Sequence, residues 1–144
     1  MTDAPHPDAT SATPNAEPFD PLKFPNDLVD AQRRLATLQA QLRVHQATLP
    51  WSREPHPGWP DETERGRERP GRPASPGWTD EQAAEFDRLM EELRAVTARV
   101  QCHAWWERCT AEGIQGPDMV AARQALKHAE GAVPLARGDV DTAA

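Results

Sequence analysis

Apolar residues recur at helical spacing in three stretches of the chain, and the longest runs from Thr79 to Glu112. Its first half has the three-then-four spacing of a helix face that packs on another helix. The residues of this face are Phe86, Leu89, Leu93, Val96 and Val100. Thr79 and Gln82 have the spacing of a capping box, and Gly113 follows the last periodic residue. The pattern predicts one continuous helix over residues 79–112.

The second half of this predicted helix has its apolar residues on another side. At about 100° per residue they fall roughly opposite Leu93. They are Cys102, Trp105, Trp106 and Cys109. A helix that is apolar on one side early and on the other side late is expected to have two different partners.

Residues 26–49 are the second predicted helix, because leucine recurs there every seven residues. The repeat is Leu28, Leu35, Leu42 and Leu49, with Ala31, Leu38 and His45 at the complementary positions. This is a heptad pattern over three repeats. Residues 117–130 are the third predicted helix, with proline at its first position. One face of it carries Met119, Ala122, Leu126 and Ala129.

Together these stretches predict an all-α fold, with a helical domain over residues 19–130. Helices 26–49 and 79–112 form an antiparallel, coiled-coil-like hairpin. Helix 117–130 is too short to be stable alone in water, so it is expected to dock on the face that carries Cys102 to Cys109. Two helices and a short third one bury little apolar surface. A homodimer that forms a four-helix bundle would cover both faces.

The remaining segments are rich in proline. Residues 1–18 are expected to be a disordered tail and residues 131–144 a loose tail. Between them, Phe19, Leu22 and Phe24 are expected to lie across an apolar helix surface. Residues 50–78 contain seven prolines and four glycines, which predicts a flexible linker. Its Pro57–Glu62 stretch is nearly repeated at Pro76–Glu81, where the long helix opens, so a short helical turn is expected from Pro60 to about Arg69.

Composition and charge narrow the classes of function. The formal net charge of −7 argues against a general nucleic-acid coat and against adsorption to anionic membranes. No apolar run is long enough to span a membrane, and the N-terminus lacks a signal-peptide pattern, so a cytoplasmic location is expected. An arginine cluster could contact nucleic acid, and Trp51 and Trp59 could stack on bases. The arginines are Arg65, Arg67, Arg69 and Arg72, and acidic residues are mixed among them.

Candidate catalytic and metal-binding chemistry is sparse. Cys102 and Cys109 would be about 10 Å apart on one helix, too far for a disulfide, and are interpreted as two reduced, buried thiols. His103 and Glu107 are the best candidate metal ligands, but the cysteines would point away from His103. No nucleophile, phosphate-loop or zinc motif occurs. We therefore expect no enzymatic activity, no metal and no cofactor.

Three stretches resemble a known group of proteins. They are Leu49-Pro50-Trp51-Ser52, Pro76-Gly77-Trp78-Thr79, and Gly116-Pro117-Asp118 running to Ala125-Leu126-Lys127-His128-Ala129. Together they resemble small uncharacterised helical proteins of high-GC actinobacteria. The resemblance covers most of residues 25–130. It implies no catalytic or binding residue, because no function is attached to that group.

These observations favour a non-enzymatic helical protein–protein interaction or scaffold module that self-associates or binds a protein partner. Its interaction face is expected to comprise Leu28, Leu35, Leu38, Leu42, Phe86, Leu89, Leu93, Val96 and Val100. The third-helix docking face is expected to comprise Cys102, Trp105, Trp106, Cys109, Met119 and Leu126. The alternative is a small DNA-associated regulator or accessory factor that uses the arginine-rich linker with Arg123 and Lys127.

Overall fold

Helices are the main secondary structure in the computed structural model, which describes residues 17–134. In chain order the elements are α2 (Asn26–Gln46), β1 (Glu62–Glu64), β2 (Arg67–Arg69), α3 (Asp80–Gln101), α4 (Ala104–Ala111) and α5 (Pro117–Leu126). The prediction of an all-α fold is confirmed only in part, because the chain is mostly helical but also contains two short strands. Apart from residues 17–18 and 131–134, the two predicted tails lie outside the described residues.

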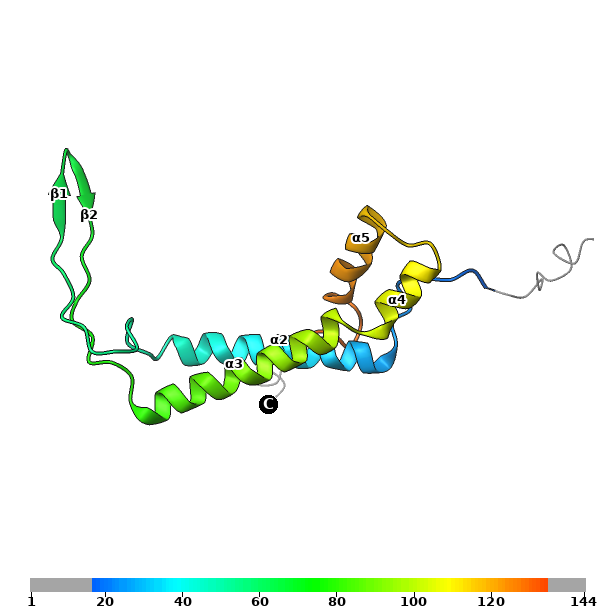
Figure 1. Cartoon of the computed structure of the whole chain (residues 1–144), viewed down its shortest axis with the longest axis horizontal. Helices are drawn as coiled ribbons and strands as arrows, with labels where there is room; N and C mark the ends of the chain where they lie inside the picture. The colour runs from blue at the N-terminus through cyan, green and yellow to red at the C-terminus, as the bar shows by residue number, and fades with distance from the viewer. Residues whose placement is uncertain (1–16, 135–144) are drawn as a thin grey trace, which may run out of the picture.

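α2 and α3 lie side by side and run in opposite directions, and we call this pair the stem (Figure 1). Apolar side chains fill the contact between them, and burial of this surface is the main favourable contribution to the packing. The buried set is Leu28, Ala31, Leu35, Leu38, Leu89, Val96 and Val100. The predicted capping box at the start of α3 is confirmed. Thr79 Oγ1 accepts from the backbone N–H of Gln82, whose side chain accepts from the backbone N–H of Thr79.

The predicted continuous helix over residues 79–112 is wrong, because the helix is interrupted between α3 and α4. His103 has an extended backbone, with φ −63° and ψ 142°, and its Nδ1 accepts from the backbone N–H of Trp105 at 3.0 Å. The histidine side chain therefore caps α4. The indole N–H of Trp106 donates to the carbonyl of Val100 at 2.8 Å, which satisfies an acceptor at the end of α3. Because the helix is interrupted, the helical wheel of residues 79–101 does not give the directions of the side chains that follow residue 101.

Two segments cover the end of the stem next to α4. The Phe19 ring lies 5.2 Å from that of Trp105, and the Trp105 indole N–H donates to the carbonyl of Pro21 at 3.2 Å. Residues 19–24 thus lie across an apolar helix surface, as the sequence predicted. α5 begins with the predicted Pro117 but ends at Leu126, before the predicted residue 130. The chain then returns to α2, where Arg33 Nη1 donates to the carbonyl of Gly131 at 3.1 Å.

A paired β-ribbon replaces the predicted flexible linker and its short helical turn. Isolated bridges join His56 to Ser75 and Trp59 to Arg72, and β1 pairs with β2 beyond them. We call residues 56–75 the arm, which projects from one end of the stem (Figure 1). Its turn has positive φ at Arg65 (53°) and Gly66 (78°), as in the tight turns that match strand twist. The predicted helical turn from Pro60 to about Arg69 is wrong, because the turn at Arg65 and Gly66 lets the segments on either side of it pair as strands.

Candidate functional site

An open groove of about 810 Å³ runs along the stem near the arm, and we call it the stem groove. Residues of α2 and of the turn that follows it form one wall, and residues of α3 form the other. The lining is Thr37, Ala40, Gln41, Val44, His45, Thr48, Glu85, Arg88, Leu89 and Pro134. Five of these recur at helical spacing along one side of α2 and its C-terminal extension. They are Thr37, Ala40, Gln41, Val44 and Thr48, which we call the α2 stripe.

The α2 stripe carries no charged side chain, although 27% of the residues of the chain are charged. Val44, near its centre, leaves 70% of its surface exposed, the highest value among the exposed large apolar residues of the described chain. The stripe lies on a side of α2 that points away from Leu35 and Leu38, which face α3. α2 therefore has two apolar or neutral sides, of which only one is covered within the stem.

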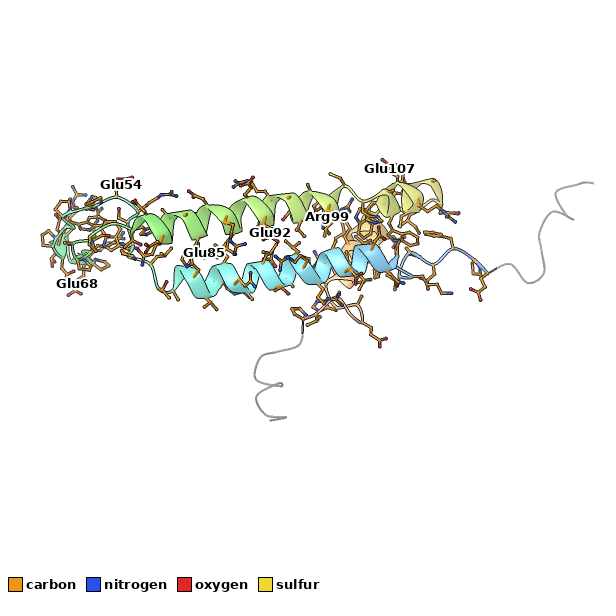
Figure 2. All side chains as sticks on the ribbon, turned by 90° about the horizontal axis from the view of Figure 1, so that it is seen from below. Glu54, Glu68, Glu85, Glu92, Arg99 and Glu107 are labelled. Atoms are coloured by element: carbon orange, nitrogen blue, oxygen red, sulfur yellow. The ribbon has the colours of Figure 1, made fainter. Side chains whose placement is uncertain are left out.

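Charged side chains line the α3 wall of the groove. Arg88 pairs with Glu85 at 2.6 Å and with Glu92 at 3.2 Å along α3. Glu92 also accepts from Arg34 of α2, whose Nε lies 3.0 Å from Oε1. The hydrogen bond from Arg88 lowers the pKa of Glu85, and that from Arg34 lowers the pKa of Glu92. Figure 2 shows Glu85 and Glu92 between the two helices.

His45 and Pro134 contribute to the groove from different parts of the chain. The Nε2–H of His45 donates to the backbone carbonyl of Gln82 at 3.1 Å, which ties the end of α2 to the first turn of α3. Pro134 follows the segment in which Gly131 accepts from Arg33. The groove thus lies between a fixed contact near the arm and the returning C-terminal chain.

The interaction face predicted from the sequence lies inside the stem rather than on its surface. Six of its nine residues are buried: Leu28, Leu35, Leu38, Leu89, Val96 and Val100. Leu42 and Leu93 are partly buried against the same core, and Phe86 packs on Trp78 with ring centroids 5.0 Å apart. These side chains pack within one chain, so a partner would have to use another surface.

The predicted third-helix docking face is divided by the interruption before α4. Trp106, Cys109 and Leu126 lie in one buried cluster, and Met119 packs against it. Trp105 also packs against this cluster and in addition contacts residues 19–24, whereas the prediction that Cys102 is buried is wrong, because Cys102 ends α3 in an exposed position. Burial raises the pKa of the Cys109 thiol, which favours its uncharged form.

The aromatic residues of the linker form a closed cluster at the base of the arm. The Trp51 ring lies 5.0 Å from His56 and 5.5 Å from Trp59, and Arg72 lies over Trp51 at 5.1 Å. The rings contact one another edge to face, an arrangement that is itself stabilising. The cluster thus anchors the arm, and the only ring in it that is exposed is that of Trp59.

Two of the four arginines of the arm are placed opposite acidic residues. Glu62 faces Arg69 and Glu64 faces Arg67 across the two strands. Residues 61–72 contain four acidic residues and four arginines, so the arm is neutral.

Within residues 17–134 no three His, Cys, Asp or Glu side chains are grouped as metal ligands would be, and His103 pairs with Asp27 at 2.9 Å. None of the helices described is long and apolar enough to cross a membrane.

Sequence reasoning missed the α2 stripe. The heptad repeat of leucines identified the covered side of the helix, and Val44 lies outside that repeat. A second signal was present, because Thr37, Gln41, Val44 and Thr48 are spaced by four, three and four residues and are all uncharged.

Comparison with known proteins gives a family but no function. A family model for a domain of unknown function, DUF8825, matches residues 27–129, which include every helix and strand described except the first residue of α2. This agrees with the expectation of a protein group without an assigned function. No curated protein and no solved structure matches the chain.

Proposed function

The chain belongs to the DUF8825 family, and from that premise we propose that it is a non-enzymatic protein-interaction module whose stem groove binds an amphipathic helix. The observation that carries the proposal is Val44, 70% exposed within an uncharged stripe that lines a groove of about 810 Å³. A protein partner that covers Val44 would remove this apolar surface from water, which favours binding.

The spacing of the groove residues favours a helix as the bound element. From Thr37 to Thr48 the α2 stripe spans eleven residues, about 17 Å or three turns. A helix that presents small apolar residues at three-and-four spacing would pack lengthwise on the α2 stripe, as in helix-in-groove recognition. At the other end of the stem, α4, α5 and residues 19–24 already supply such a cover.

Direct DNA binding by the arm is less well supported. A two-stranded ribbon has a shape that a major groove can admit. Phosphate affinity, however, depends on net positive charge. The strand arginines Arg67 and Arg69 face Glu64 and Glu62, and Arg72 lies over Trp51.

Site-specific photo-cross-linking tests the docking role. A photoreactive amino acid at position 44 should form an adduct with a defined protein in the source cells. The same group at position 39, which is exposed on another side of α2, should not. The captured protein, once purified, should bind the wild-type chain and lose binding to Val44→Glu. Equal labelling from both positions, or unchanged binding of the variant, would refute the proposal.

A further inference from the structure

On each wall of the stem groove the side chains lie on both sides of a midpoint, which we call the centre of that wall. The two centres lie at the same level along the stem. On α2, Thr37 and Val44 are equidistant from the point between Ala40 and Gln41. On α3, the charged pair is Glu85 and Arg88, three residues apart and opposite in sign. A surface with such a centre is suited to pairing with its own copy.

Two contacts across the stem fix the level of each centre. Arg34 pairs with Glu92, and eleven residues further along α2 His45 contacts Gln82, ten residues earlier on α3. Interpolation between these contacts places Ala40 and Gln41 at the level between Glu85 and Arg88. A two-fold axis that crosses the stem at right angles through this level passes through both centres.

We propose that the stem groove packs face to face on the same groove of a second copy of this chain, turned about that transverse two-fold axis. This inference rests on the proposed docking role and names its partner. The two α2 stripes then run antiparallel, with Thr37 opposite the partner's Val44 and Ala40 opposite the partner's Gln41. Thr37, Ala40, Gln41 and Val44 thus meet only uncharged residues, and Thr48 lies beyond this central part of the stripe.

The charges on the α3 walls agree with the same axis. Glu85 of one copy faces the partner's Arg88, and Arg88 faces the partner's Glu85. At these two positions like charges do not meet and each Glu85 gains a second cation, whereas Glu92, on the same side of α3, comes level with the partner's Glu81. Exposed ion pairs contribute little each, so they select the arrangement, while burial of Val44 and its neighbours supplies the attraction.

The arms do not provide an equivalent two-fold contact. Each strand has a free edge, but β1 carries Glu62 and Glu64, while β2 carries Arg67 and Arg69 on either side of Glu68. Pairing either edge antiparallel with its own copy would bring like charges together. The described chain thus has charges that oppose arm-to-arm pairing and charges that permit groove-to-groove pairing.

A charge-reversal experiment tests the arrangement. Glu85→Arg makes both charged residues that line the α3 wall of the groove arginines, and Arg88→Glu makes both of them glutamates. Each variant should self-associate about tenfold more weakly than the wild type, because both symmetry-related pairs become repulsive. Mixing the two variants should restore wild-type association as a heterodimer, which native mass spectrometry resolves by mass.

The mixed sample separates an effect between copies from an effect within one chain. Both variants lose the Glu85–Arg88 pair along α3, and mixing cannot restore that pair. Circular dichroism of each variant should show wild-type helix content. Association in the mixture no stronger than in the separate variants would overturn the two-fold arrangement.

Other occupants of the groove give different results. A wild-type chain that stays monomeric at high micromolar concentration overturns the inference, and a position-44 adduct to residues 135–144 would identify the chain's own segment as the occupant. A monomeric chain whose position 44 cross-links to a different, defined protein also overturns the inference but keeps the proposed docking role.

Discussion

Replacing Leu126 by alanine should undock α5 from the rest of the molecule. Leu126 is 1% exposed, and it lies in a buried cluster with Trp106 and Cys109. α5 has ten residues and contributes only one other buried side chain, that of Ala122. A helix of this length is marginal in water without tertiary contacts. The substitution therefore removes the main apolar anchor of the helix.

The cost follows from the size and burial of the side chain. Leu→Ala at a fully buried position costs 2–5 kcal/mol, and about 3 kcal/mol is expected for an anchor at the edge of a small core. For a domain near 100 residues this lowers Tm by roughly 15 °C. If α5 undocks before the rest unfolds, the loss in Tm is smaller and Trp106 becomes exposed to water.

Thermal unfolding by circular dichroism and tryptophan emission measure the two effects. Leu126→Ala should lower Tm and shift emission to longer wavelength. Val120→Ala is the matched control, because Val120 lies on the same helix and is 58% exposed. The control should change stability by less than about 0.5 kcal/mol. Equal Tm values and identical emission for the two variants would refute the packing of α5 on Trp106.

Three further predictions concern the interruption, the arm and the stem. His103→Ala should lower the free energy of unfolding by about 1 kcal/mol, because the α4 cap is lost. His103→Asn should retain most of that stability, since asparagine caps well; equal losses would exclude capping of the Trp105 N–H. Gly71→Ala should disorder the arm without unfolding the stem, because an added Cβ would collide with the carbonyl of Trp59; an unchanged NMR signal from the Trp59 indole would contradict this. The pKa of Glu92 is lowered from 4.5, so the folded state binds its proton less readily than the unfolded state. Its stabilising contribution is then present above pH 4.5 and lost as pH falls through the folded-state pKa, and Glu92→Gln should flatten the acid side of a plot of unfolding free energy against pH.

Local signals in the sequence identified several features of the fold. The capping box of Thr79 and Gln82 and the proline at the start of α5 involve residues close in sequence, so their chemistry can be read without a structure. The apolar repeats likewise located most residues of the buried cluster. Such patterns show which side of a helix is covered, but they do not show the surface that remains uncovered.

The interruption at His103 could not be predicted from local spacing, because it depends on a contact with a residue far away in the sequence. Histidine is not among the preferred capping residues, and its ring is held by Asp27, 76 residues earlier in the chain. The arm was missed because five of the six residues in its strands are charged, and Thr63 is the one β-branched residue of the kind that usually marks strands. Val44 was missed because the exposure of its side of α2 is decided by where α3 and residues 131–134 pack.

Sedimentation velocity over a range of micromolar concentrations tests most directly whether the stem groove joins two copies of the chain. The sedimentation coefficient of the wild type should rise with concentration, while that of Val44→Glu should remain at the monomer value. Gln39→Glu adds the same charge to another side of α2 and should behave as the wild type does. A wild type that stays monomeric, or three proteins that associate equally, would contradict a dimer built on the groove.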